Sequence, residues 1–201
     1  QGNLLDKKSV KQNTFHLSTL ASKIADHQVE YAVICHNELV NRNAPSPNAK
    51  GAIRELVKRM IENSKEPNLG IEKYPPEKAI YESVLLKNGI HRSDDNGESY
   101  YFSKPDKNSS FAKIWQATDE FLVKKQGELV TAHEIYQLWQ QPPYGIKAGL
   151  CDILYIAYIL SRFTEVANYI EEEYKPSLQY LLAEYLLKSA KSVGLREVSH
   201  L

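Results

Sequence analysis

The stretch Ala148-Gly-Leu-Cys-Asp-Ile-Leu-Tyr-Ile-Ala-Tyr-Ile-Leu-Ser-Arg162 decides the fold of the second half of this chain. Its side chains are apolar on nearly every side of a helix, which predicts a helix buried in a core. It is shorter than the ~20 apolar residues that cross a bilayer, and it contains Asp152. We therefore expect it at the centre of a globular domain, with no membrane contact.

The segments around this helix follow the element order of a winged helix-turn-helix, which we predict over about 109 to 175. Hydrophobic periodicity, an N-cap residue and a proline-rich stop mark its parts. The predicted elements are a helix from Ser109 or Ser110 to about Lys125, an extended residue at Val130, a helix from its cap Thr131 to Gln140, a stop at Pro142-Pro143-Tyr144-Gly145, and a strand at Val166–Glu172. A last helix from Pro176 to about Val193, ended by Gly194, and a short strand at Leu195–Val198 complete the chain.

The first half is predicted to be helical, with one hairpin of strands. Apolar residues at steps of three and four indicate helices, and Asn96-Gly97 between two extended runs indicates a β-turn. The predicted elements are a long helix over Ser9–Arg42 with a break near His27, a helix at about Ala49–Asn63 that pairs with it, a helix from Pro75-Pro76 to about Lys87, and a β-hairpin from Ile90 to Phe102.

These elements predict a mainly α protein. We expect an N-terminal helical hairpin or bundle followed by a winged helix-turn-helix-like domain with short β-hairpins. The predicted domain boundaries are a helical domain at 1–88, a β-hairpin linker at 89–108, and a winged-helix-like domain with a C-terminal helix at 109–201.

Composition excludes several classes of protein. Lys plus Arg and Asp plus Glu number 25 each, so the chain lacks the strong basic excess that is typical of many nucleic-acid-binding domains. The two cysteines, Cys35 and Cys151, are too few for a disulfide-stapled secreted domain and are expected to be reduced core thiols. The N-terminus has no signal-peptide pattern and no initiator Met, so we expect a cytoplasmic protein that is a piece of a longer one.

One part of the chain consists of Pro142-Pro-Tyr-Gly-Ile-Lys-Ala-Gly149, the apolar helix, Val166-Ala-Asn-Tyr-Ile-Glu-Glu172 and Pro176-Ser-Leu178. This part resembles a winged-helix-like stretch of large bacterial P-loop ATPases, which are found in phage-defence islands. Leu69–Leu85 resembles the segment that precedes it. The two resemblances cover roughly half of the chain. They imply a C-terminal region of such an ATPase, whose catalytic core lies elsewhere, because no Gly-x-x-x-x-Gly-Lys-Ser/Thr occurs in these residues.

Three short motifs partly match the sequence of a catalytic or metal-binding site, and each lacks a required feature. His133-Glu134 begins like a zinc-protease helix, but Gln137 stands where the second His belongs. Asp94-Asp-Asn-Gly97 lacks the ligand spacing of a calcium loop and is typical of a hairpin turn. Cys151 sits in an apolar helix, where a reactive thiolate is disfavoured. We therefore expect no enzyme activity, no metal and no cofactor in this segment.

A basic ridge is the one candidate binding site. Lys50, Arg54 and Lys58 recur every four residues with Arg59 beside them, and Lys147 opens the apolar helix. A solvated helix face is the usual structural meaning of such a ridge, and phosphate contact is the functional alternative. Three features argue against DNA reading: the buried character of helix 148–162, the carboxylates Glu171–Glu173 at the expected wing tip, and a tyrosine cluster typical of core edges and protein interfaces. The tyrosines of this cluster are Tyr155, Tyr158, Tyr169, Tyr174, Tyr180 and Tyr185.

These observations favour a non-catalytic assembly or interaction module of a larger bacterial ATPase. Its partner is expected to be the rest of a longer polypeptide or another protein subunit. The alternative is a nucleic-acid-binding winged-helix module that contacts the DNA backbone through Lys50, Arg54, Lys58, Arg59 and Lys147. An enzyme assembled from scattered residues ranks third.

Overall fold

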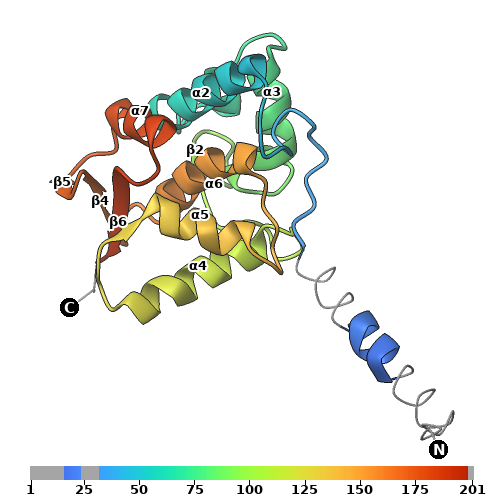
Figure 1. Ribbon diagram of the computed structural model, residues 1–201. Helices are drawn as coiled ribbons and strands as arrows, with labels where there is room; N and C mark the ends of the chain where they lie inside the picture. The colour runs from blue at the N-terminus through green and yellow to red at the C-terminus, as the bar shows by residue number, and fades with distance from the viewer. Residues whose placement is uncertain (1–15, 24–31, 199–201) are drawn as a thin grey trace, which may run out of the picture.

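A computed structural model describes residues 16–23 and 32–198 of the chain (Figure 1). The parts of the predicted first helix at 9–15 and 24–31 lie outside the described residues, whereas residues 16–23 are helical. The rest forms a helical body with two small antiparallel sheets, so the fold mixes helices and strands more than the mainly α prediction.

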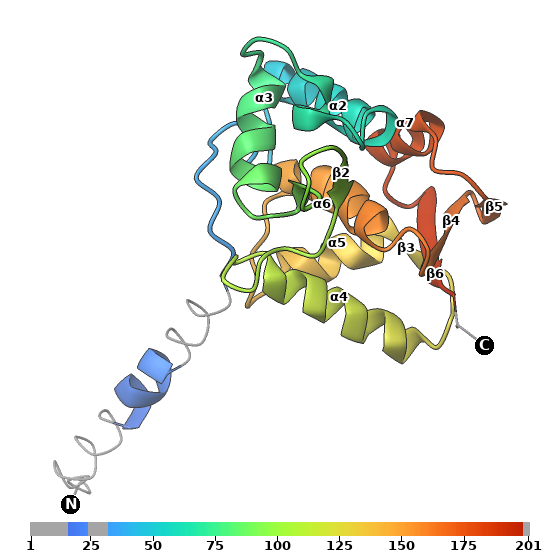
Figure 2. The ribbon, with the colours of Figure 1, turned by 180° about the vertical axis from the view of Figure 1, so that it is seen from behind.

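The apolar helix α6 (Ala148–Ser161) lies at the centre of the body, as predicted (Figures 1 and 2). Its side chains from Ile153 to Ile159 are all buried, and helices pack on two sides of it. On one side lie α2 (Pro47–Glu62), α3 (Pro76–Ile80) and α7 (Tyr180–Lys188), and on the other α4 (Ala112–Lys125) and α5 (Ala132–Gln140). The short turn η1 (Pro67–Gly70) and the π-helical turn η2 (Tyr81–Leu86), which continues α3, complete the first side.

A four-stranded antiparallel sheet lies at one end of the body, in the order β3-β6-β4-β5. The strands are β3 (Val130–Thr131), β4 (Val166–Ile170), β5 (Glu173–Lys175) and β6 (Val193–Glu197). The succession α4, β3, α5, α6, β4 follows the predicted order, and β4 and β5 form a wing-like hairpin. However, the C-terminal strand β6 pairs with both β3 and β4 and separates them.

The predicted β-hairpin is confirmed as β1 (His91–Ser93) and β2 (Tyr100–Phe102). His91 and Phe102 are directly paired across it, and both are buried. Their side chains therefore attach the hairpin to the body as part of its packing, because neighbouring residues across antiparallel strands share one face.

The predicted long helix is wrong for residues 32–42, which run extended and then through turns. The backbone N–H of Val33 donates to the Tyr144 carbonyl, and that of Ile34 donates to the Ser110 hydroxyl. A helix would satisfy these groups within four residues, whereas here they bind partners far along the chain. Consequently α2 does not form a hairpin with this segment, and it packs on α6 instead.

Three further boundaries differ from prediction. The cap of α4 is Phe111, because the hydroxyl of Ser109 bonds to Asn88 and to the Phe111 N–H, one residue before the helix. Helix α7 is shorter than predicted, since it begins at Tyr180. Gly194 lies within β6, where a Cβ would stand 2.9 Å from the Val130 carbonyl oxygen, so its role is close strand contact and not helix termination.

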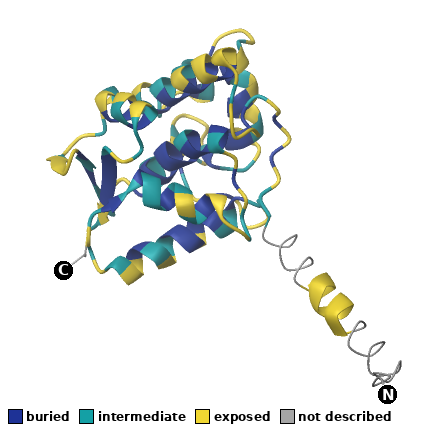
Figure 3. Ribbon diagram, in the orientation of Figure 1, coloured by how far each residue is buried: buried dark blue, intermediate teal, exposed yellow. Residues whose placement is uncertain are grey.

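The core is continuous from one end of the body to the other (Figure 3). It contains residues of α2 such as Leu56 together with residues of α6 such as Leu154 and of the sheet such as Leu195. Gly149 permits one close approach within it, because a Cβ there would lie 2.5 Å from the Val40 carbonyl oxygen. This core contains residues from both sides of positions 88 and 108, and the domain boundaries there remain predictions.

Candidate functional site

The structure separates the five basic residues of the predicted ridge. Lys50 and Arg54 are exposed on α2, and Lys58 lies half-buried with its ammonium 5.8 Å from the centre of the Tyr180 ring. Arg59 lies elsewhere: its guanidinium bonds to Glu55 at 2.9 Å and to the Gly70 carbonyl at 3.0 Å. This pairing gives Arg59 a structural role in holding η1 against α2.

Lys147 is exposed at the start of α6, beside the turn that precedes α2. That turn is held there by the Gly149 N–H, which donates to the Arg42 carbonyl at 3.0 Å. The groove of about 350 Å³ that Arg54 lines is formed instead with residues of α7: Tyr180, Glu184, Leu187 and Lys188. The structure thus brings Arg54 together with a cation of α7 that the sequence pattern did not indicate, and it does not bring Lys147 to that groove.

A second, more apolar groove of about 330 Å³ opens between α2, β2 and the end of α6. Tyr101 and Phe163 are large apolar side chains that are 46% and 49% exposed there, and half-buried Leu160 and Leu178 lie between the elements. Its lining is completed by Ile61, Ser64, Lys65, Tyr100 and Phe102. The sequence pattern does not indicate this groove, because its residues come from four segments that only the fold brings together.

A buried histidine supports the wall of the apolar groove. His91 is fully buried, its Nδ1 accepts a hydrogen bond from the Tyr81 hydroxyl at 3.0 Å, and its Nε2 donates to the Ser64 carbonyl at 2.9 Å. Burial lowers its pKa, opposed by the hydrogen bond to Ser64. Its ring also lies against Tyr100 and Phe102, so a neutral His91 holds β2 to the end of α2.

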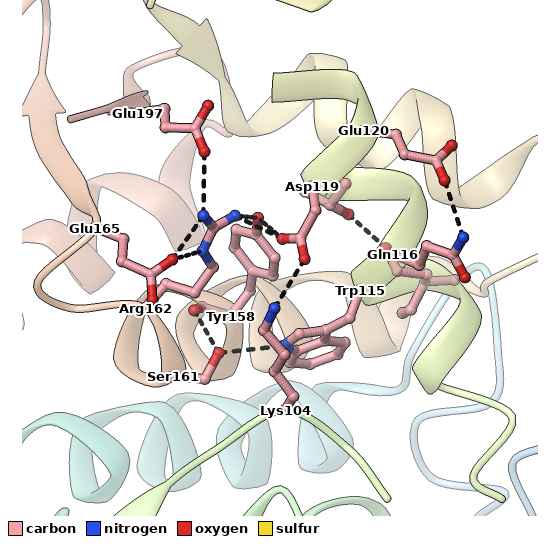
Figure 4. A network of polar contacts seen from close by, with 12 residues as sticks. Lys104, Trp115, Gln116, Asp119, Glu120, Tyr158, Ser161, Arg162, Glu165 and Glu197 are labelled. Carbon is pink, nitrogen blue, oxygen red and sulfur yellow. Dashed lines mark hydrogen bonds and ion pairs between the residues drawn. The ribbon is translucent and has the colours of Figure 1, made fainter. Parts of the chain in front are cut away.

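The most extensive polar cluster surrounds Arg162, at the end of α6 (Figure 4). Its guanidinium, 8% exposed, bonds to Asp119 at 2.6 Å, Glu165 at 2.7 Å and Glu197 at 3.1 Å. Tyr158 donates its hydroxyl proton to Asp119 at 2.7 Å, and burial together with that carboxylate raises the pKa of Tyr158. All three guanidinium nitrogens are engaged, so the cluster connects α4, α6 and β6.

The motifs that resembled catalytic or metal sites have structural roles. Thr131 and Glu134 form a capping box at the start of α5, and Lys125 bonds to Glu134 at 3.0 Å. Burial alone would raise the pKa of Glu134, yet the hydrogen bonds from Thr131 and Lys125 together lower it. Burial raises the pKa of both thiols, Cys35 and Cys151. Among the described residues, no three His, Cys, Asp or Glu side chains are grouped to hold a metal ion.

The turn between β4 and β5, where the sequence predicts a wing tip, carries exposed carboxylates. Glu171 and Glu172 turn the chain between β4 and β5 with positive φ, and both are exposed. Among the tyrosines of the predicted cluster, Tyr155 and Tyr158 are fully buried in α6, and only Tyr174 is more than half exposed. The cluster is therefore chiefly part of the core and its edge.

Comparison with known proteins adds no assignment: no family model, no curated protein and no solved structure matches this chain. None of the helices in the described ranges, 16–23 and 32–198, has the length and apolar character needed to cross a membrane.

Proposed function

We propose that this chain is a non-catalytic assembly module of a larger bacterial ATPase of the phage-defence type, and that it holds a protein partner in its apolar groove. The observation that carries the proposal is that two exposed aromatic side chains, Tyr101 and Phe163, line one groove together with the half-buried Leu160 and Leu178. Water-exposed aromatic side chains in a hollow lose little conformational entropy on binding and gain much from burial.

The composition of the groove matches a protein interface. Most of the residues that line it are aromatic or aliphatic, and its lining also includes Ser64 and the exposed Lys65. Interfaces between proteins commonly combine an apolar centre, in which Tyr and Phe are enriched, with a polar rim. A bound segment would touch α2, β2 and α6 together, so partner binding would also stabilise the contact between the two halves of the body.

The resemblance of segments 69–85 and 142–178 to phage-defence ATPases supports the class of the partner. This sequence lacks a P-loop motif, so nucleotide hydrolysis would reside in the partner or in another part of the same polypeptide. The groove would then be the place where the ATPase core contacts this module.

Site-specific photo-crosslinking in the native cell tests the proposal. A benzoylphenylalanine introduced at Phe163 should crosslink to a polypeptide that carries a P-loop, identified by mass spectrometry of the linked peptide. The matched control is Val123 on α4, which is 64% exposed and lies outside the groove. Equal crosslinking from position 123, or linked peptides that come only from proteins without a P-loop, would contradict the proposal.

A charge placed in the groove gives a second readout. Phe163→Asp should abolish co-purification of the ATPase while leaving the melting temperature of the module within a few degrees, because this side chain is half exposed. Val123→Asp should leave both quantities unchanged.

A further inference from the structure

The groove between α2 and α7 carries cations on both of its walls. Arg54 stands on α2 and Lys188 on α7, both exposed, and both line the hollow. Within the described part of the chain, neither forms an ion pair, and the same holds for Lys50 one turn before Arg54. Of the residues that the structure describes, one carboxylate lines the groove, that of Glu184.

The residues that line the groove therefore carry a net positive charge. Arg54 and Lys188 stand against one acid, Glu184, and the ammonium of Lys58 lies 5.8 Å from the centre of the Tyr180 ring, although acids are as numerous as bases in the chain as a whole. Cations gathered in a hollow raise the local potential and attract polyanions. Arg54 also presents a planar fork of donors that suits phosphate oxygens.

The groove offers an aromatic ring as well as charge. Tyr180, the first residue of α7, is half-buried and lines the hollow, with Lys58 over its ring. A base that has left a duplex stacks on such a ring, whereas a base inside a duplex has no free face. Charge along a helix combined with an aromatic side chain is the arrangement that binds single strands.

We propose that the α2–α7 groove binds the phosphodiester backbone of single-stranded nucleic acid, with Arg54 and Lys188 on phosphates and Tyr180 against a base. This inference does not rest on the proposed function, because the two grooves share no lining residue. It narrows the basic ridge seen in sequence: Arg59 and Lys147 are left out, and Lys188, Tyr180 and Glu184 are added.

The test is fluorescence anisotropy of a labelled oligothymidylate of about 20 nucleotides, titrated with the full chain at two salt concentrations. Arg54 and Lys188 correspond to two phosphate contacts, so affinity should fall roughly 7-fold between 50 and 200 mM salt. In Arg54→Ala or Lys188→Ala the fall should shrink to roughly 3-fold, because one contact is lost. Tyr180→Leu should weaken binding about tenfold with no change in salt dependence.

Glu184→Gln supplies a variant that must gain affinity. Its side chain is exposed, so the fold is expected to tolerate the change, and loss of its charge should tighten binding several-fold. Lys124→Ala on α4 removes an equally exposed cation away from the groove and should change nothing. Circular dichroism of every variant confirms that the helices are retained.

Three results would overturn the inference. The first is no change in anisotropy at tens of micromolar protein in low salt. The second is binding that Arg54→Ala, Lys188→Ala and Lys124→Ala weaken equally, since the groove would then have no special part. The third is tighter binding of a duplex of the same length than of the single strand, which would exclude the stacking role of Tyr180.

Discussion

The guanidinium Nη1 of Arg162 lies 2.6 Å from Oδ1 of Asp119, and this ion pair fixes the end of α6 to the middle of α4. The same arginine holds Glu165 beside β4 and Glu197 on β6, so one nearly buried cation organises three carboxylates. Removing a single partner from such a cluster is costly, because the remaining charges stay desolvated and unpaired.

Arg162→Met should therefore lower the free energy of unfolding by about 3–5 kcal/mol, measured by urea denaturation at neutral pH. Arg42→Met is the matched control, because the one ion pair of Arg42 with a residue in the described ranges is an exposed contact of 3.6 Å with Glu38. Its effect should stay within ~0.5 kcal/mol. Similar losses in the two variants would show that the Arg162 cluster contributes no more than a surface pair.

Asp152 makes stability fall as pH rises. Burial raises the pKa of its carboxyl from 3.8 to about 6, and the hydrogen bond from Tyr136 opposes this rise. The folded state then binds the proton more tightly than the unfolded state, so the free energy of unfolding decreases between about pH 4 and pH 6 and stays lower above. The contribution is up to ~3 kcal/mol, at about 1.4 kcal/mol per pKa unit.

Asp152→Asn keeps an acceptor for the Tyr136 hydroxyl and removes the charge. It should raise the denaturation midpoint at pH 7.5 and leave it little changed near pH 3, below 3.8, where the carboxyl is largely protonated in both the folded and the unfolded state. The difference between wild type and variant isolates this group from the other acids. A difference that is constant from pH 4 to 7.5 would contradict the prediction.

His91 has the opposite dependence on pH. Burial lowers its pKa below 6.5, so the unfolded state binds the proton more readily. Stability from the neutral ring is fully present above about pH 6.5 and is lost as pH falls below that value. His91→Gln keeps a donor for Ser64 and an acceptor for Tyr81. The denaturation midpoint of this variant should decrease less than that of wild type between pH 7.5 and pH 5. An equal decrease would contradict the contribution of the neutral His91 ring to stability.

Replacing two helical glycines, Gly149 and Gly51, by alanine should change the free energy of unfolding in opposite directions. In Gly149→Ala the new Cβ meets the Val40 carbonyl oxygen at 2.5 Å, so backbone must move, at a cost of about 1–3 kcal/mol. In Gly51→Ala, on α2, nothing lies within 4 Å, and the better helix former should add about 0.5–1 kcal/mol. Thermal melts of the two variants, side by side, check both signs.

Much of the secondary structure followed from local pattern. The apolar run of α6, the Thr131 cap of α5, the Asn96-Gly97 turn and the alternation of β4 were each readable, and each is confirmed. These features act within a few residues, through periodicity, capping and turn geometry, so the sequence alone expresses them.

Residues 32–42 show where local pattern fails. Their spacing of apolar side chains matches a helix, yet the Val33 and Ile34 N–H groups bind Tyr144 and Ser110. Partners more than seventy residues away leave no mark on local periodicity, and they outweigh a modest helix propensity. The pairing of β6 with both β3 and β4 is also invisible to local pattern, since it depends on where the chain lies after α7.

The candidate sites likewise combine features that the sequence indicates with features that depend on the fold. The sequence by itself determined that the chain lacks a P-loop and a zinc-protease helix, and that α2 carries cations every fourth residue. Only the tertiary structure decided that Arg59 is tied to Gly70, that Lys188 and Tyr180 face Arg54, and that Tyr101 and Phe163 share a groove. Spacing fixes which side chains share one helix face, whereas packing of distant elements fixes which faces meet.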